Sequence, residues 1–138
     1  MGQETERSND AELEGVLDAG AVLAAIRDEP GGDYAERVIP QSVILSVNLS
    51  EVATVLVRNG MPFPVASQVL TSLGMQVVPF DAELALRAAS LFPIGKPLGL
   101  SLGDRACLAL ALHRGSPVFT TERRWAELQL PIKVEVIR

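Results

Sequence analysis

The most constraining feature of the chain is a set of short apolar runs that alternate with helical segments. The clearest run is SVILSV at residues 42–47, which is continuous and β-branched, as is typical of a strand buried on both faces. Further short strands are expected at residues 13–17, 75–80, 117–120 and 133–137. Because alternating strands and helices need crossover connections, the pattern predicts a three-layer α/β/α sandwich around a central, mostly parallel sheet.

The segments between these runs are rich in good helix formers and carry boundary residues of the expected kind. Helices are expected at residues 19–26, 33–39, 49–59, 61–73, 81–92, 101–114 and 122–128. Gly60, Gly74 and Gly115 follow three of these segments, as is common at helix ends. The segment PIGKPLGL, residues 93–100, is expected to be a loop because of its prolines and glycines.

Length and composition set the scale of the fold. The 138 residues correspond to one domain, and 48% hydrophobic with only 4% aromatic residues indicates an aliphatic core. No apolar run approaches the roughly 20 residues of a membrane span, and the N-terminus lacks the pattern of a secretory signal. The single cysteine, Cys107, excludes an internal disulfide and is expected to be a small core residue. A cytoplasmic location is therefore expected.

The acidic charge is concentrated at the N-terminus. Residues 1–14 contain five acids and one base, so this segment accounts for −4 of the net charge of −5 and leaves −1 for residues 15–138. We expect residues 1–14 to be a disordered acidic tail and residues 15–138 to form the folded domain. A nearly neutral domain does not suit a high-affinity, non-specific nucleic-acid binder, but it suits an enzyme that binds phosphate mainly through metal.

Four acids lie at or near the starts of expected helices. They are Asp18, Glu51, Asp104 and Glu122. Each acid alone is well explained as a helix cap, because a carboxylate near a helix N-terminus gains about 0.3–1 kcal/mol from the dipole. Asn48 with Glu51 and Ser101 with Asp104 have the spacing of a capping box.

The four acids together favour a second interpretation. All strand-to-helix turns of a parallel sheet lie along its carboxyl edge, so these carboxylates would converge there and repel one another. A divalent cation would compensate the charge, and oxygen ligands without His or Cys favour Mg²⁺ or Mn²⁺ over Zn²⁺. Such a centre is suited to the cleavage of phosphodiester bonds.

The segments VLDAGAVLA, SVNLSEV, SLGDRACLALAL and VFTTERRW occur in an order that resembles the PIN-domain ribonucleases. The resemblance is greatest to the VapC-type toxins of toxin–antitoxin pairs, and it extends over residues 15–138. It implies an Mg²⁺- or Mn²⁺-dependent endoribonuclease that cleaves RNA phosphodiester bonds by metal-activated water. It also implies that a small antitoxin holds the enzyme inactive and that the toxin forms a homodimer.

The resemblance assigns roles to individual residues. It implies that Asp18, Glu51 and Asp104 are catalytic, metal-binding acids and that the Thr120 hydroxyl lines the substrate site. Glu122 would be the fourth catalytic, metal-binding acid, but it stands where the family usually has Asp. This difference leaves open whether a second metal binds.

Arginines near these segments are candidates for phosphate contacts. Arg105 and Arg123 are the expected substrate-binding residues, and Arg27 and Arg124 lie nearby, although each of these arginines is also explained as a surface residue paired with a local acid. Trp125 is expected to pack in the core rather than stack on a base. The main alternative function is a non-catalytic PIN-like module that binds RNA or protein, and the next is a metal phosphatase or a DNA nuclease.

Overall fold

The computed structural model describes residues 15–138, and the predicted acidic tail at residues 1–14 lies outside the described residues. The strands are β1 (Val16–Leu17), β2 (Val43–Leu45), β3 (Gln76–Val78), β4 (Val118–Thr120) and β5 (Val134–Val136). They form one sheet in the order β3-β2-β1-β4-β5, and every neighbouring pair is parallel. The prediction of a central parallel sheet is therefore confirmed.

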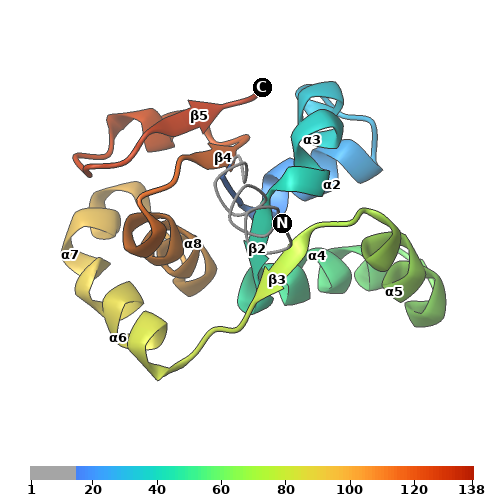
Figure 1. Cartoon of the computed structure of the whole chain (residues 1–138), viewed down its shortest axis with the longest axis horizontal. Coiled ribbons are helices and arrows are strands. Elements are labelled where there is room, and N and C mark those ends of the chain that lie inside the picture. Colours follow the sequence, from blue (N-terminus) through green and yellow to red (C-terminus); the bar gives the residue numbers. More distant parts are fainter. Residues whose placement is uncertain (1–14) are drawn as a thin grey trace, which may run out of the picture.

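Helices cover both faces of this sheet (Figure 1). The α-helices are α2 (Ala19–Ile26), α3 (Gly32–Val38), α4 (Ser46–Arg58), α5 (Phe63–Ser72), α6 (Ala82–Ser90), α7 (Phe92–Gly95) and α8 (Leu102–Arg114). Short 3₁₀ helices are η1 (Ile39–Gln41), η2 (Lys96–Leu98) and η3 (Arg123–Glu127). Figure 1 shows α6, α7 and α8 together on one side of the sheet. Within residues 15–138, no helix has the length and apolar character needed to cross a membrane.

Two apolar clusters lie on opposite faces of the sheet. Along β2, Val43 and Leu45 belong to one cluster and Ile44 belongs to the other, as the alternation of side chains in a strand requires. The first cluster includes α6, α8 and the buried Trp125, and the second includes α2, α3, α4 and α5. The three-layer sandwich and the core position of Trp125 are thus confirmed.

Two local predictions are wrong. Residues 93–100 are not a loop, because α7 and η2 lie within or overlap this segment. Each of these helices carries its proline in the first turn, where the missing N–H costs no hydrogen bond. The strand expected at residues 42–47 is shorter, because Ser46 already begins α4 and leaves only Val43–Leu45 in β2.

Candidate metal centre

Asp18 lies where β1 ends and α2 begins. Its carboxylate caps α2 by accepting a hydrogen bond from the Ala21 N–H at 2.7 Å. The hydroxyl of Thr120, the last residue of the adjacent strand β4, donates to Asp18 Oδ2 at 2.5 Å. Only 6% of the Asp18 surface is exposed, and Thr120 is fully buried. Two neighbouring strands thus hold one carboxylate at the carboxyl edge of the sheet.

The environment of Asp18 opposes its negative charge. Burial raises the pKa of its carboxyl from 3.8 to about 7, although the hydrogen bonds from Thr120 and Ala21 act to lower it. The charges of Asp104 and Glu122 contribute smaller increases that are part of this rise in the pKa. None of the arginines or lysines among residues 15–138 forms an ion pair with Asp18 or with those two acids. The charge of Asp18 is therefore not balanced by an ion pair within the described chain.

Glu51 is held beside the start of α8. The side-chain amide of Asn48 donates to Glu51 Oε1 at 2.8 Å and to the Gly103 carbonyl at 3.0 Å. The capping box predicted for Asn48 and Glu51 is wrong, because α4 begins at Ser46 and Asn48 already lies inside its first turn. Sequence reasoning missed this contact. The sequence shows the spacing of Asn48 and Glu51, but it does not show that Gly103 lies beside them in the fold.

Asp104 both caps a helix and adds negative charge near Asp18. The Ser101 N–H donates to Asp104 Oδ2 at 2.9 Å, and the Asp104 N–H donates to Ser101 Oγ at 3.1 Å. The capping box predicted at the start of α8 is therefore confirmed. Because Asp104 also raises the pKa of Asp18, the same carboxylate caps a helix and adds negative charge to the site.

Cys107 lies one helical turn further along α8 and is fully buried, as predicted. Its thiol donates a weak hydrogen bond to the Leu17 carbonyl, with the two atoms 3.7 Å apart. Burial raises the pKa of this thiol well above its usual range, and the charges of Asp18, Asp104 and Glu51 act in the same direction. Acids from three separate parts of the chain thus act on the same buried thiol.

Glu122 lies at the outer side of this arrangement. Its N–H donates to Thr120 Oγ1 at 2.9 Å, while its carboxylate makes no capping bond to η3. The side chain is exposed. The name carboxylate cluster is used below for Asp18, Glu51, Asp104 and Glu122.

The carboxylate cluster fits a hard divalent cation in its chemistry. It offers oxygen donors and uncompensated negative charge, and the buried Asn48 Oδ1 beside Glu51 has no hydrogen-bond partner among the described residues. As the side chains of residues 15–138 stand, however, no three His, Cys, Asp or Glu side chains are grouped closely enough to hold one ion. Metal binding would have to draw the carboxylates together.

The arginines expected to bind substrate have different surroundings. Arg105 Nη1 donates to the Ala88 carbonyl at 2.9 Å, and its guanidinium lies over the Phe92 ring at 5.6 Å. These contacts connect α8 to α6 and α7. Arg123 is exposed and lies beside Glu122 at the start of η3. Arg123 is thus the one of the two whose guanidinium has no hydrogen-bond or ion-pair partner among the described residues.

The variant Gly103→Ala tests the position of Glu51 separately from fold stability. Gly103 is the second residue of α8, and alanine loses less backbone entropy than glycine at a helical position. A Cβ at Gly103 would overlap the carboxylate of Glu51, the mobile end of a flexible side chain. We expect an unchanged or higher melting temperature in EDTA, with Mn²⁺ affinity about 10–100-fold weaker in calorimetric titration. Unchanged Mn²⁺ affinity would show that Glu51 is not a ligand.

Comparison with known proteins gives a consistent set of matches. The family model described as PIN domain matches residues 15–130. No curated protein matches the chain. Among solved structures, a toxin–antitoxin complex from Klebsiella pneumoniae aligns with a TM-score of 0.67 at 17% identity, covering 87% of this chain and 99% of the other. VapBC2 from Rickettsia felis, bound to a DNA fragment from its promoter, aligns with a TM-score of 0.66 at 12% identity, covering 87% and 96%. FitAB, bound to a DNA fragment, aligns with a TM-score of 0.65 at 18% identity, covering 89% and 95%.

Proposed function

Because the chain belongs to the PIN-domain family, we propose that it is an Mg²⁺- or Mn²⁺-dependent endoribonuclease and the toxin of a toxin–antitoxin pair. The observation that carries the proposal is the environment of Asp18, a buried carboxyl whose pKa is raised to about 7. Further acids repel its charge, and no described cation pairs with it. A divalent ion bound beside Asp18 would balance this negative charge, which gives an enzyme a physical reason to keep a buried carboxyl among other acids.

The proposed roles follow from the contacts of each residue. Asp18, Glu51 and Asp104 would hold the ion, and Glu122 would support it from the exposed side. When bound, Mg²⁺ or Mn²⁺ supplies activation of water and neutralises charge that develops at phosphorus.

Neighbouring residues fix the positions of these acids. Thr120 Oγ1 donates to Asp18 and accepts from the backbone of Glu122, so one hydroxyl positions two members of the carboxylate cluster. Asn48 orients Glu51 through its amide. Cys107 has no place in this chemistry as a nucleophile, because its raised pKa keeps the thiol protonated.

The proposed partners are a small antitoxin and a second copy of the chain. Two of the similar structures are described as toxin–antitoxin or VapBC assemblies, and this relation supports the antitoxin. Exposed apolar side chains on α5 and β3 also support a protein partner. Phe63 is 64% exposed and Val77 is 45% exposed, and both line a groove between α4, α5 and β3.

A non-catalytic PIN-like module that binds RNA or protein is the second candidate. It is favoured by Glu122, which replaces the usual Asp, and by the spread of the acids, no three of which are grouped around one ion position among residues 15–138. Cleavage of RNA distinguishes the proposed ribonuclease from this non-catalytic module.

The test is incubation of the purified protein with defined RNAs in EDTA, Mg²⁺ or Mn²⁺, followed by sequencing of the ends. We expect cleavage only with metal, leaving 5′-phosphate and 3′-hydroxyl ends, because hydrolysis by water needs no 2′-hydroxyl attack. Cyclic phosphate ends would indicate a different mechanism or a contaminating nuclease. RNA binding without cleavage in any metal would favour the non-catalytic module.

A further inference from the structure

A hollow of about 370 Å³ lies beside Glu122. It is lined by Thr121, Glu122, Arg123, Arg124 and Arg138. Two segments form it: η3 with the turn before it, and the residues that follow β5. They meet because β4 and β5 are parallel neighbours and the Ile137 N–H donates to the Thr120 carbonyl at 2.9 Å.

The hollow has an excess of positive charge in an otherwise acidic chain. Three arginines and one glutamate line it, whereas residues 15–138 together carry a net charge of −1. Arg123 and Arg138 form no ion pair or side-chain hydrogen bond with any described residue. The Nε atom of Arg124 lies 4.0 Å from Glu127, a long contact between two exposed side chains.

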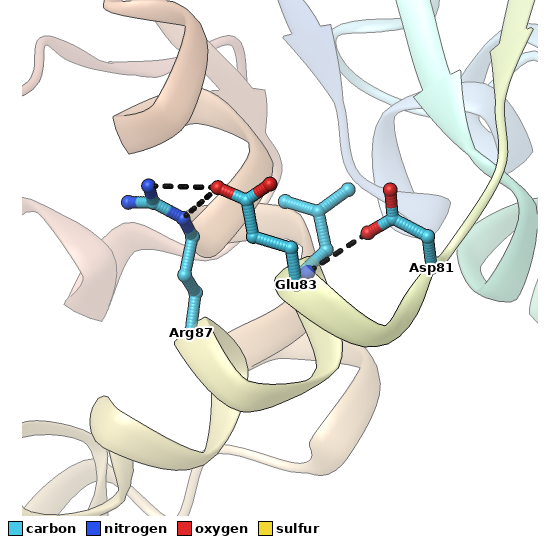
Figure 2. Close-up of polar contacts among 4 residues, drawn as sticks. Asp81, Glu83 and Arg87 are labelled. Atoms are coloured by element: carbon cyan, nitrogen blue, oxygen red, sulfur yellow. Dashed lines mark hydrogen bonds and ion pairs between the residues drawn. The ribbon is translucent and has the colours of Figure 1, made fainter.

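Several other arginines of the described chain have partners, whereas Arg58 and Arg114 have none. Arg27 and Arg87 form ion pairs at 3.3 Å and 3.0 Å, and Arg37 lies over the Tyr34 ring. Figure 2 shows Arg87 on α6 with both its Nε and one terminal nitrogen on Glu83. Arg123 and Arg138 are therefore two unpaired arginines that line the same hollow, where their donors are available for an external anion.

The hollow is connected to the carboxylate cluster by a short chain of contacts. Thr120 Oγ1 binds both the Asp18 carboxylate and the N–H of Glu122, and Glu122 lines the hollow. A phosphate cut at the carboxylate cluster belongs to a strand whose adjacent phosphates must lie close by. Guanidinium groups bind phosphate oxygens through paired, charge-assisted hydrogen bonds.

We propose that this hollow is a binding subsite for the backbone phosphates of the RNA strand next to the cleavage position, with Arg123 and Arg138 as its main contacts. The subsite rests on the proposed ribonuclease function, and it specifies where the RNA strand lies beside the carboxylate cluster. Arg124 contributes less because Glu127 partly balances its charge. The carboxylates would act on one phosphate while the arginines hold its neighbours.

The experiment measures binding of a fluorescein-labelled oligouridylate in EDTA by anisotropy, across a series of NaCl concentrations. Each phosphate contact of a single strand contributes about 0.7 to the slope of log K against log salt concentration. We expect Arg123→Gln and Arg138→Gln each to reduce the slope by about 0.7, and the double variant by about 1.4. Arg138→Lys should keep the slope, because it keeps the charge.

The matched control is Arg87→Gln, which makes the same charge change on α6, away from the C-terminal end of β5 (Figure 1). A double variant with the slope of wild type and Arg87→Gln overturns the subsite, as does a wild type that does not bind the oligonucleotide. If the wild type cuts RNA with Mn²⁺ but the slopes are equal, the subsite fails and the proposed function stands. If the slopes differ but no metal gives cleavage, the arginines bind RNA phosphates, and the nuclease proposal fails together with the placement of the subsite beside a cleavage position.

Discussion

Without metal, the protein should become less stable as the pH rises from about 4 to about 7, and Asp18→Asn should abolish most of this loss. The folded pKa of Asp18 is about 7, against an ordinary value of 3.8. Between these values the folded state holds a proton that the unfolded state has released, so increasing pH favours unfolding. The stability present below pH 3.8 is lost as the pH passes about 7, which amounts to a loss on the order of 4 kcal/mol.

The measurement is urea unfolding of wild type and Asp18→Asn in EDTA over this pH range. Asparagine retains an oxygen for the hydrogen bond from the Ala21 N–H but carries no charge. The two proteins should have similar stability at low pH, and the variant should be the more stable above neutrality. Adding Mn²⁺ should stabilise only the wild type, because metal binds the ionised carboxylate. A difference between the two proteins that does not change with pH would contradict the assignment.

Asp104→Asn should remove the metal response of the protein with little effect on its metal-free stability. The variant weakens the capping box with Ser101, which costs about 0.5–1 kcal/mol, but it also relieves repulsion with Asp18. We expect an unchanged or raised melting temperature in EDTA and a much smaller shift with Mn²⁺. RNA cleavage should fall by more than about 100-fold, since even outer contacts to metal ligands contribute about 10–100-fold.

Asp81→Asn is the matched control for this experiment. Asp81 caps α6 by accepting a hydrogen bond from the Leu84 N–H at 2.9 Å, outside the carboxylate cluster (Figure 2). Asparagine keeps an oxygen for the bond from the Leu84 N–H, so the control should lose only the charge at the helix N-terminus, about 0.3–1 kcal/mol, and should keep both its Mn²⁺ shift and its cleavage. If Asp104→Asn behaves like Asp81→Asn, then Asp104 is a helix cap and not a metal ligand.

The layers of the fold were predictable because each depends on a local pattern. The parallel sheet follows from apolar runs alternating with helices, and Ser101 with Asp104 announces the start of α8 by spacing alone. The extent of β2 was not predictable from residues 42–47. A short apolar run of this kind suits a buried strand and the first turn of a helix equally well. Likewise, the prolines and glycines of residues 93–100 indicate turns, whereas packing of Arg105 on Phe92 favours short helices there.

The candidate site was predictable only as a set of acids on one edge. Parallel connectivity alone brings Asp18 and Glu122 to the same edge, since β1 and β4 are neighbours. The amide of Asn48 contacts the Gly103 carbonyl 55 positions further along the sequence, and no local pattern encodes that contact. The arginine hollow likewise depends on the pairing of β4 with β5, which brings Arg138 to η3.

The buried thiol of Cys107 can report separation of α8 from the sheet. Cys107 belongs to α8, its thiol contacts the carbonyl of Leu17 at the end of β1, and it is the only cysteine in the chain. A disulfide reagent can reach this sulfur only when α8 separates from the sheet, and only the thiolate reacts. The rate at which the unaltered protein is labelled therefore measures how often α8 separates from the sheet. Ligands that draw those carboxylates together would slow the reaction without touching the sulfur.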